Sequence, residues 1–186
     1  MSFFLLPHIN NTINNDNIEL KYNNDNISYI SLTLNNYLNN IKLEINNNYE
    51  TWDFVKKYTN PYEFIHTNVP NSKCSISKYN PLSRSFYKMI ELSNMLNIFD
   101  DFKDININTF HLAEGPGGFI EATNYLRKNK SDKYYGMTLI EPTNNNVPGW
   151  NKSSSYLEAN SNIIIEKGIS GTGDLLLVDN LKHCNS

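Results

Sequence analysis

The chain has 186 residues, of which 39% are hydrophobic and 12% aromatic, which is enough for one domain with a buried core. Its formal net charge of −3 excludes a protein that coats nucleic acid through a global positive field, so any RNA contact must be local. No run approaches the ~18 apolar residues of a membrane span, and Met1–Pro7 lacks the basic start of a signal peptide, which predicts a soluble intracellular protein.

Residues 8–48 are dominated by asparagine and form a segment distinct from the rest of the chain. Asparagine favours turns, whereas the alternating apolar residues of Ile27–Leu34 suit an extended strand. We therefore predict short strands and loops in a separate N-terminal segment, residues 1–48.

The next stretch predicts a short helix from Tyr49 to Tyr58, because Trp52, Val55 and Tyr58 recur at helical spacing. Asn60-Pro61 then ends or redirects the chain, since proline disfavours a helical residue before it.

A second helix is predicted from Pro81 to about Phe99, with Ser83 as its N-cap. Its buried side carries Phe86, Met89 and Ile90, followed by residues 93–96. Arg84 and Lys88 lie one turn apart on a single face.

A strand, a tight loop and a helix follow, at Ile107–Ala113, Glu114–Gly118 and Phe119–Lys128. Tyr134–Ile140 and Asn162–Glu166 read as further strands separated by longer connections. Strands that alternate with such connections are typical of a mostly parallel sheet flanked by helices, so the predicted class is α/β.

The loop after the first strand contains Gly115-Pro116-Gly117-Gly118. Glycines after a strand let the backbone pass close to a bound ligand, and the next helix begins with free N–H groups. Neither the G-x-G-x-x-G spacing of dinucleotide folds nor the lysine of a phosphate loop is present. The residues alone indicate a nucleoside-type cofactor or, more simply, a tight turn.

Four segments resemble one known family. Ala113–Phe119 resembles the cofactor motif of FtsJ-like ribose 2'-O-methyltransferases, especially the cap-specific mRNA enzymes that include forms from large DNA viruses. Gly136–Leu139, Gly171–Leu175 and Ser83–Lys88 resemble that family's second strand, its adenine-contacting segment and its upstream catalytic helix. The resemblance covers roughly residues 50–180.

This resemblance implies a Rossmann-like class I methyltransferase fold, with residues 49–186 as the N-terminal part of the domain and the C-terminal strands missing. It implies S-adenosyl-L-methionine as cofactor, the capped 5' end of mRNA as partner, and Lys88 as a catalytic residue; it implies no metal. A location in the cytoplasm, a viral particle or factory, or the nucleus would follow. The implied cofactor-binding residues are Ala113, Glu114, Gly115, Pro116, Gly117, Gly118, Phe119, Asp174 and Leu175.

The chain departs from the family in two places. His111 stands where related enzymes often have aspartate; we expect it to be a hydrogen-bonded core histidine, and Glu114 to supply a carboxylate near the cofactor's ammonium group. The other three catalytic residues of the family, Asp, Lys and Glu, are expected beyond Ser186, so this chain by itself is expected not to turn over substrate. Alternatively, Leu175–Asp179 is the next strand and Asp179 is catalytic, although Asp174 would then lie too near for both roles.

A lysine acts as a general base only where burial and cationic neighbours lower its pKa, and Arg84 would be such a neighbour of Lys88. Tyr58, Tyr62, Tyr79 and Trp52 are either core residues or platforms for stacked bases. Other readings stay open: an rRNA 2'-O-methyltransferase, a non-catalytic remnant of the fold, and a nucleotide-binding module.

Overall fold

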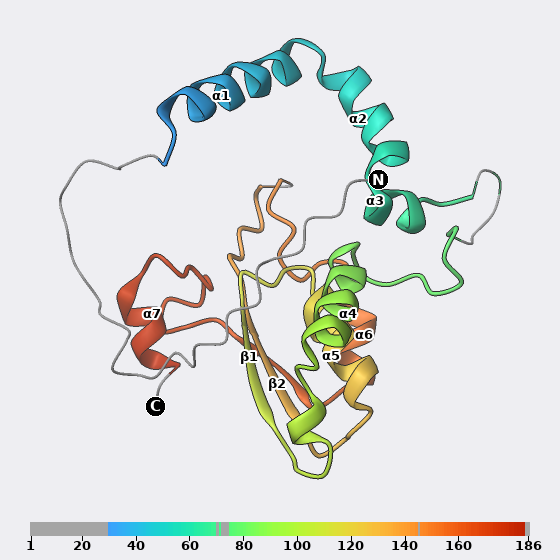
Figure 1. The fold of residues 1–186 in the computed structure, drawn as a ribbon. Coiled ribbons are helices and arrows are strands. Elements are labelled where there is room, and N and C mark those ends of the chain that lie inside the picture. The colour runs from blue at the N-terminus through green and yellow to red at the C-terminus, as the bar shows by residue number, and fades with distance from the viewer. Residues whose placement is uncertain (1–29, 70, 72–74, 145, 185–186) are drawn as a thin grey trace. The chain divides into compact units, whose positions relative to one another are not determined.

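The computed structural model describes residues 30–69, 71, 75–144 and 146–184 (Figure 1). The chain divides into two units, residues 1–47 and 48–186. Each unit is described by itself below.

The first unit contains helix α1, Leu32–Asn47, which overlaps the strand predicted at Ile27–Leu34. The strand prediction is wrong for residues 32–34, and residues 27–29 lie outside the described residues, as do the other strands and loops predicted before residue 30. Ser31 begins the helix, because its hydroxyl oxygen accepts a hydrogen bond from the Leu34 N–H at 3.2 Å. Helical spacing continues over a longer span than the alternation, through Leu34, Leu38, Ile41 and Ile45.

In the second unit, the predicted helix after residue 48 is confirmed as α2, Tyr49–Thr59. Asn60 redirects the chain into a new short helix, α3, Pro61–His66. The Asn60 side-chain oxygen accepts hydrogen bonds from the N–H groups of Tyr62 and Glu63, at 3.0 and 3.3 Å. An asparagine cap followed by proline at the first helical position is a favourable start for a helix.

Helix α4 spans Ser85–Leu96 and ends at Asn97, whose left-handed φ of 52° stops it before the predicted end at Phe99. Phe86 and Ser93 are buried, and Met89 and Ile90 are half-buried, as predicted for that side. The prediction is wrong for residues 94–96, which are exposed, because α4 ends there and no described part of the chain packs over its last turn. Ser83 is not the N-cap; Arg84 occupies that position, and the Ser83 hydroxyl instead hydrogen-bonds that of Ser85. A single 3-10 turn, η2, follows at Asp100–Phe102.

The sheet consists of β1 (Asn108–Leu112), β2 (Lys133–Met137) and β3 (Ile163–Glu166). All pairings are parallel, in the order β1-β2-β3, which confirms the predicted α/β class. Helix α5, Gly118–Arg127, connects β1 to β2, and the short helix α6, Ser154–Ala159, which was not predicted, precedes β3. Figure 1 shows α4, α5 and α6 grouped on one side of this sheet.

Beyond β3, Val178–His183 forms helix α7. The alternative reading of Leu175–Asp179 as a strand is therefore wrong, and Asp179 is an exposed helical residue paired with Lys182. Within the part of the chain that the structure describes, no helix has the length and apolar character needed to cross a membrane.

The core lies between the sheet and the helices on this side. Ile120 of α5, Tyr134 of β2 and Ile163 of β3 form its buried centre. Four partly buried side chains pack against this centre: Trp150, Tyr156, Leu157 and Ile165. Burial of these apolar groups is the main force that holds α5 on the sheet.

A buried ion pair joins the end of α5 to the start of β2. Arg127 Nε lies 2.7 Å from Asp132 Oδ2, and the two side chains are only 4% and 0% exposed. Asp132 Oδ1 also accepts the Ile107 N–H at 2.9 Å, just before β1. Burial alone would raise the pKa of Asp132, but hydrogen bonds from Arg127 and Ile107 outweigh it and the pKa is lowered.

We predict that Asp132→Asn lowers the free energy of unfolding by about 3–5 kcal/mol, because it leaves the Arg127 charge buried without its partner. Urea unfolding at pH 7, followed by far-ultraviolet circular dichroism, measures the change. Asp53→Asn is the control, since Asp53 pairs with Lys56 at the surface and should change stability much less. Equal losses in both variants would contradict a special role for the buried pair.

Candidate functional site

The candidate site begins where β1 ends. Residues Ala113–Gly117, here called the glycine loop, turn the chain from β1 into α5. Ala113 and Gly117 have positive φ angles of 53° and 110°, and the Gly115–Pro116 peptide bond is cis. The Glu114 N–H donates to the Met137 carbonyl oxygen at 3.3 Å, so the loop stays attached to the end of β2.

Two glycines here are needed for packing within the protein itself. A Cβ on Gly115 would lie 2.5 Å from the Gly149 carbonyl oxygen, and one on Gly118 would lie 2.2 Å from Ser85 Oγ. From the sequence, these glycines are predicted to allow the close approach of a ligand. The structure adds a packing role: the chain after β2 lies against Gly115, and the start of α4 lies against Gly118.

Trp150 is a residue of this region that the sequence analysis did not identify. Its ring lies 3.5 Å from where a Cβ of Gly117 would be and 2.7 Å from where a Cβ of Gly136 would be. The indole therefore packs against Gly117 and Gly136, in the space that a side chain at either position would occupy. Its signal in the sequence was weak, because a lone tryptophan after a proline and a glycine has many roles.

The connection after β3 reaches the same place. Gly173 packs so closely on Thr138 that a Cβ would lie 2.0 Å from the Thr138 carbonyl oxygen. The Ile140 N–H donates to the Thr172 carbonyl oxygen at 2.7 Å. Since Thr138 Cγ2 also lies 3.0 Å from the position of a Gly115 Cβ, the loops after all three strands meet around Thr138.

Asp174 is half-buried at this meeting point, next to the half-buried Leu175. Its Oδ1 accepts the Leu176 N–H at 2.8 Å. Asn180, which is fully buried, braces the segment by donating to the Asp174 carbonyl oxygen at 2.9 Å and accepting the Ser170 N–H at 2.9 Å. Asn180 could not be recognised from the sequence, because one asparagine carries little signal in a chain so rich in asparagine.

Glu114 is the buried carboxylate of the glycine loop. Its Oε1 accepts the N–H groups of Phe119 and Ile120, at 2.7 and 2.8 Å, and so satisfies the first turn of α5. Burial raises the pKa of Glu114 to about 7, although these two hydrogen bonds act against the rise. Oε1 is thus committed to the helix.

His111 lies on β1 with Nε2 2.9 Å from Thr109 Oγ1. Burial lowers the pKa of His111 to about 4, which keeps the ring neutral at pH 7. His111 is hydrogen-bonded, as expected, but it is half-buried on β1 and is not part of the core. A neutral ring provides no permanent charge where an aspartate was expected.

Lys88 and Arg84 share one face of α4, as predicted, and that face borders α3. The exposed Lys88 places Nζ 5.5 Å from the centre of the Tyr62 ring, and the Tyr62 hydroxyl donates to Glu91. Arg84 forms an ion pair with Glu63 of α3. The positive charge that was expected to act on Lys88 is therefore compensated by a carboxylate.

The aromatic candidates divide into two groups. Tyr58 and Trp52 on α2 are 62% and 42% exposed, and Lys56 Nζ lies 4.9 Å from the centre of the Trp52 ring. Tyr79 instead stacks on Phe86 of α4, with ring centres 4.8 Å apart, and donates its hydroxyl to Glu121. Tyr79 therefore serves packing, whereas the α2 rings are accessible for stacking.

No protein-family model matches the chain, and searches of curated proteins and solved structures return no significant match.

We predict that Glu114→Gln changes how stability depends on pH. The pKa of Glu114 is higher in the folded state than its usual value of 4.5. The contribution of Glu114 to folding stability is therefore fully present below pH 4.5 and is lost as the pH rises through about 7. Glutamine keeps an acceptor for the α5 N–H groups but carries no charge. Between pH 4.5 and pH 8, the free energy of unfolding of the variant should therefore rise by roughly 2–3 kcal/mol relative to that of the wild type.

Chemical unfolding at a series of pH values measures this difference. Glu158→Gln serves as the control, since Glu158 is exposed and should leave the wild-type profile unchanged. If Glu114→Gln also follows the wild-type profile, Glu114 does not hold its charge in a buried position.

Proposed function

We propose that this chain is an S-adenosylmethionine-dependent RNA methyltransferase domain that acts on the ribose 2'-hydroxyl of capped mRNA. One observation carries the proposal: three segments that resemble the family's motifs, far apart in the sequence, come together around Thr138. They lie beyond the carboxyl ends of parallel strands, which is where open α/β sheets bind their ligands.

The charge of the loop favours a cationic cofactor over a phosphate. In dinucleotide folds, the N–H groups at the start of the helix bind phosphate. Here Glu114 Oε1 occupies the Phe119 and Ile120 N–H groups, so a phosphate would not find these donors free and would meet a carboxyl group that is partly ionised at pH 7. S-adenosylmethionine carries an ammonium and a sulfonium, both positive, which argues for it and against a nucleotide-binding module.

The proposed cofactor residues fit this arrangement. The glycine loop, with Gly118 and Phe119, would lie along the methionine part, and Asp174 with Leu175 would contact the adenine. Asp174 is held in place by its own hydrogen bond to Leu176 and by Asn180. When bound, the cofactor would supply the electrophilic methyl group, while the protein aligns the two reactants.

Lys88 is the proposed catalytic residue, and α4 links it to the loop through the contact of Ser83 and Ser85 with Gly118. Its exposed ammonium can bind an RNA phosphate directly. A second candidate is a cofactor-binding domain without catalysis. The compensation of Arg84 by Glu63 favours it, since the charge of the cation expected to lower the pKa of Lys88 is then neutralised.

We predict that isothermal titration detects binding of S-adenosylmethionine and S-adenosylhomocysteine but not of ATP. Asp174→Asn should weaken cofactor binding about 10-fold, which corresponds to about 1.4 kcal/mol. Asp179→Asn is the matched control, because Asp179 is exposed on α7 and pairs only with Lys182 in the described residues. Binding of ATP without binding of either sulfur compound would overturn the proposal.

We further predict that, in a chain extended by the segments that carry the family's other catalytic residues, Lys88→Ala abolishes methyl transfer to capped RNA while the cofactor dissociation constant stays within about twofold, a change under ~0.5 kcal/mol. Transfer of a radiolabelled methyl group measures the activity. Lys182→Ala should leave it unchanged, since Lys182 is a solvent-exposed lysine on α7. If the extended chain with Lys88 intact binds the cofactor but methylates no RNA, the second candidate is the correct one.

A further inference from the structure

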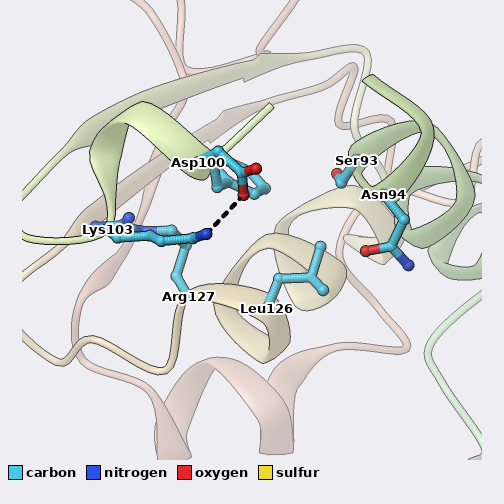
Figure 2. Close-up of a pocket in the computed structure, with 7 residues that line it drawn as sticks. Ser93, Asn94, Asp100, Lys103, Leu126 and Arg127 are labelled. Atoms are coloured by element: carbon cyan, nitrogen blue, oxygen red, sulfur yellow. Dashed lines mark ion pairs between the residues drawn. The ribbon is translucent and has the colours of Figure 1, made fainter. Parts of the chain in front are cut away.

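A cavity of about 200 Å³ opens at the ends of α4 and α5 (Figure 2). The opposite end of α4 contacts Gly118, so this cavity lies away from the glycine loop. Its walls come from the last turns of α4 and α5 and from the chain around η2. The residues that line it are Ser93, Asn94, Phe99, Asp100, Lys103, Leu126 and Arg127.

Ser93 is an unsatisfied polar group in the wall of this cavity. Its side chain is on the buried side of α4, the residue is 5% exposed, and its hydroxyl has no hydrogen-bond partner among the described residues. A buried hydroxyl left without a partner costs about 1–3 kcal/mol, so most such groups have one. Figure 2 shows Ser93 and Asn94 on one wall of the cavity and Asp100 opposite them.

The electrostatics of the cavity favour a cation. Both helices present their carboxyl ends here, and these ends carry partial negative charge. The Arg127 charge is compensated by Asp132. Asp100 is paired with Lys103 at 3.0 Å, but these side chains are 54% and 68% exposed, and such a surface pair is weak enough for a ligand to replace.

We propose that this cavity binds a small organic ammonium ion, of the primary alkylamine or polyamine class. Its N–H groups donate to the Asp100 carboxylate, the Ser93 hydroxyl and the Asn94 side-chain oxygen. Its methylene groups pack on Phe99 and Leu126, where the aromatic ring also favours a cation. This site is independent of the proposed cofactor site.

Isothermal titration of the whole chain with putrescine and spermidine at constant ionic strength tests the proposal. We predict that Asp100→Asn and Ser93→Ala each weaken putrescine binding at least 5-fold. Lys103→Ala should strengthen it several-fold, because it removes the group that competes for Asp100. A variant that binds more tightly must be folded, so damage to the fold cannot explain the whole pattern.

Asp179→Asn is the matched control, since Asp179 and Lys182 form the same kind of surface pair three residues apart on α7. It should leave putrescine binding unchanged. Three results would each overturn the proposal: no binding by the wild type, equal weakening by Asp100→Asn and Asp179→Asn, or full affinity in Ser93→Ala.

Discussion

The contact on which the site depends is the one between the Glu114 carboxylate and the first N–H groups of α5. It links the glycine loop to the helix that follows and satisfies backbone donors that would otherwise need water or a ligand. It also places a buried carboxyl group, whose pKa is raised to about 7, at the carboxyl end of β1. The same interaction therefore stabilises the turn and occupies the N–H groups of Phe119 and Ile120.

Close packing then joins the other strand connections to this turn. Gly115 and Gly173 allow the chain to approach Gly149 and Thr138 at distances that a side chain would prevent. At the other end of the sheet, Asp132 pairs with Arg127 of α5 and accepts the N–H of Ile107, so it attaches the residue before β1 to the end of α5. Between these two anchored ends, the buried centre of Ile120, Tyr134 and Ile163 keeps the helix on the sheet.

The strand–loop–helix order around the glycine loop could be predicted because local signals agreed there. Apolar runs of strand length, glycines and a helical pattern each act over a few neighbouring residues, and β1, α5, β2 and β3 were placed within a few residues of their observed bounds. The strand prediction was wrong within Leu32–Asn47 because the short apolar alternation that ends at Leu34 overlaps a longer helical spacing, which continues to Ile45. It also missed α6 and α7, whose six residues each carry too little periodicity to be recognised.

By itself, the sequence determined the α/β class, the parallel sheet and the segments in which a site should be sought. Only the tertiary structure decided what surrounds each side chain: that Glu114 caps α5, that Arg84 is paired with Glu63, and that Trp150 lies beneath the loop. The reason is physical. Secondary structure follows from interactions between near neighbours, whereas burial, charge compensation and close contact depend on residues that folding brings together from distant parts of the chain.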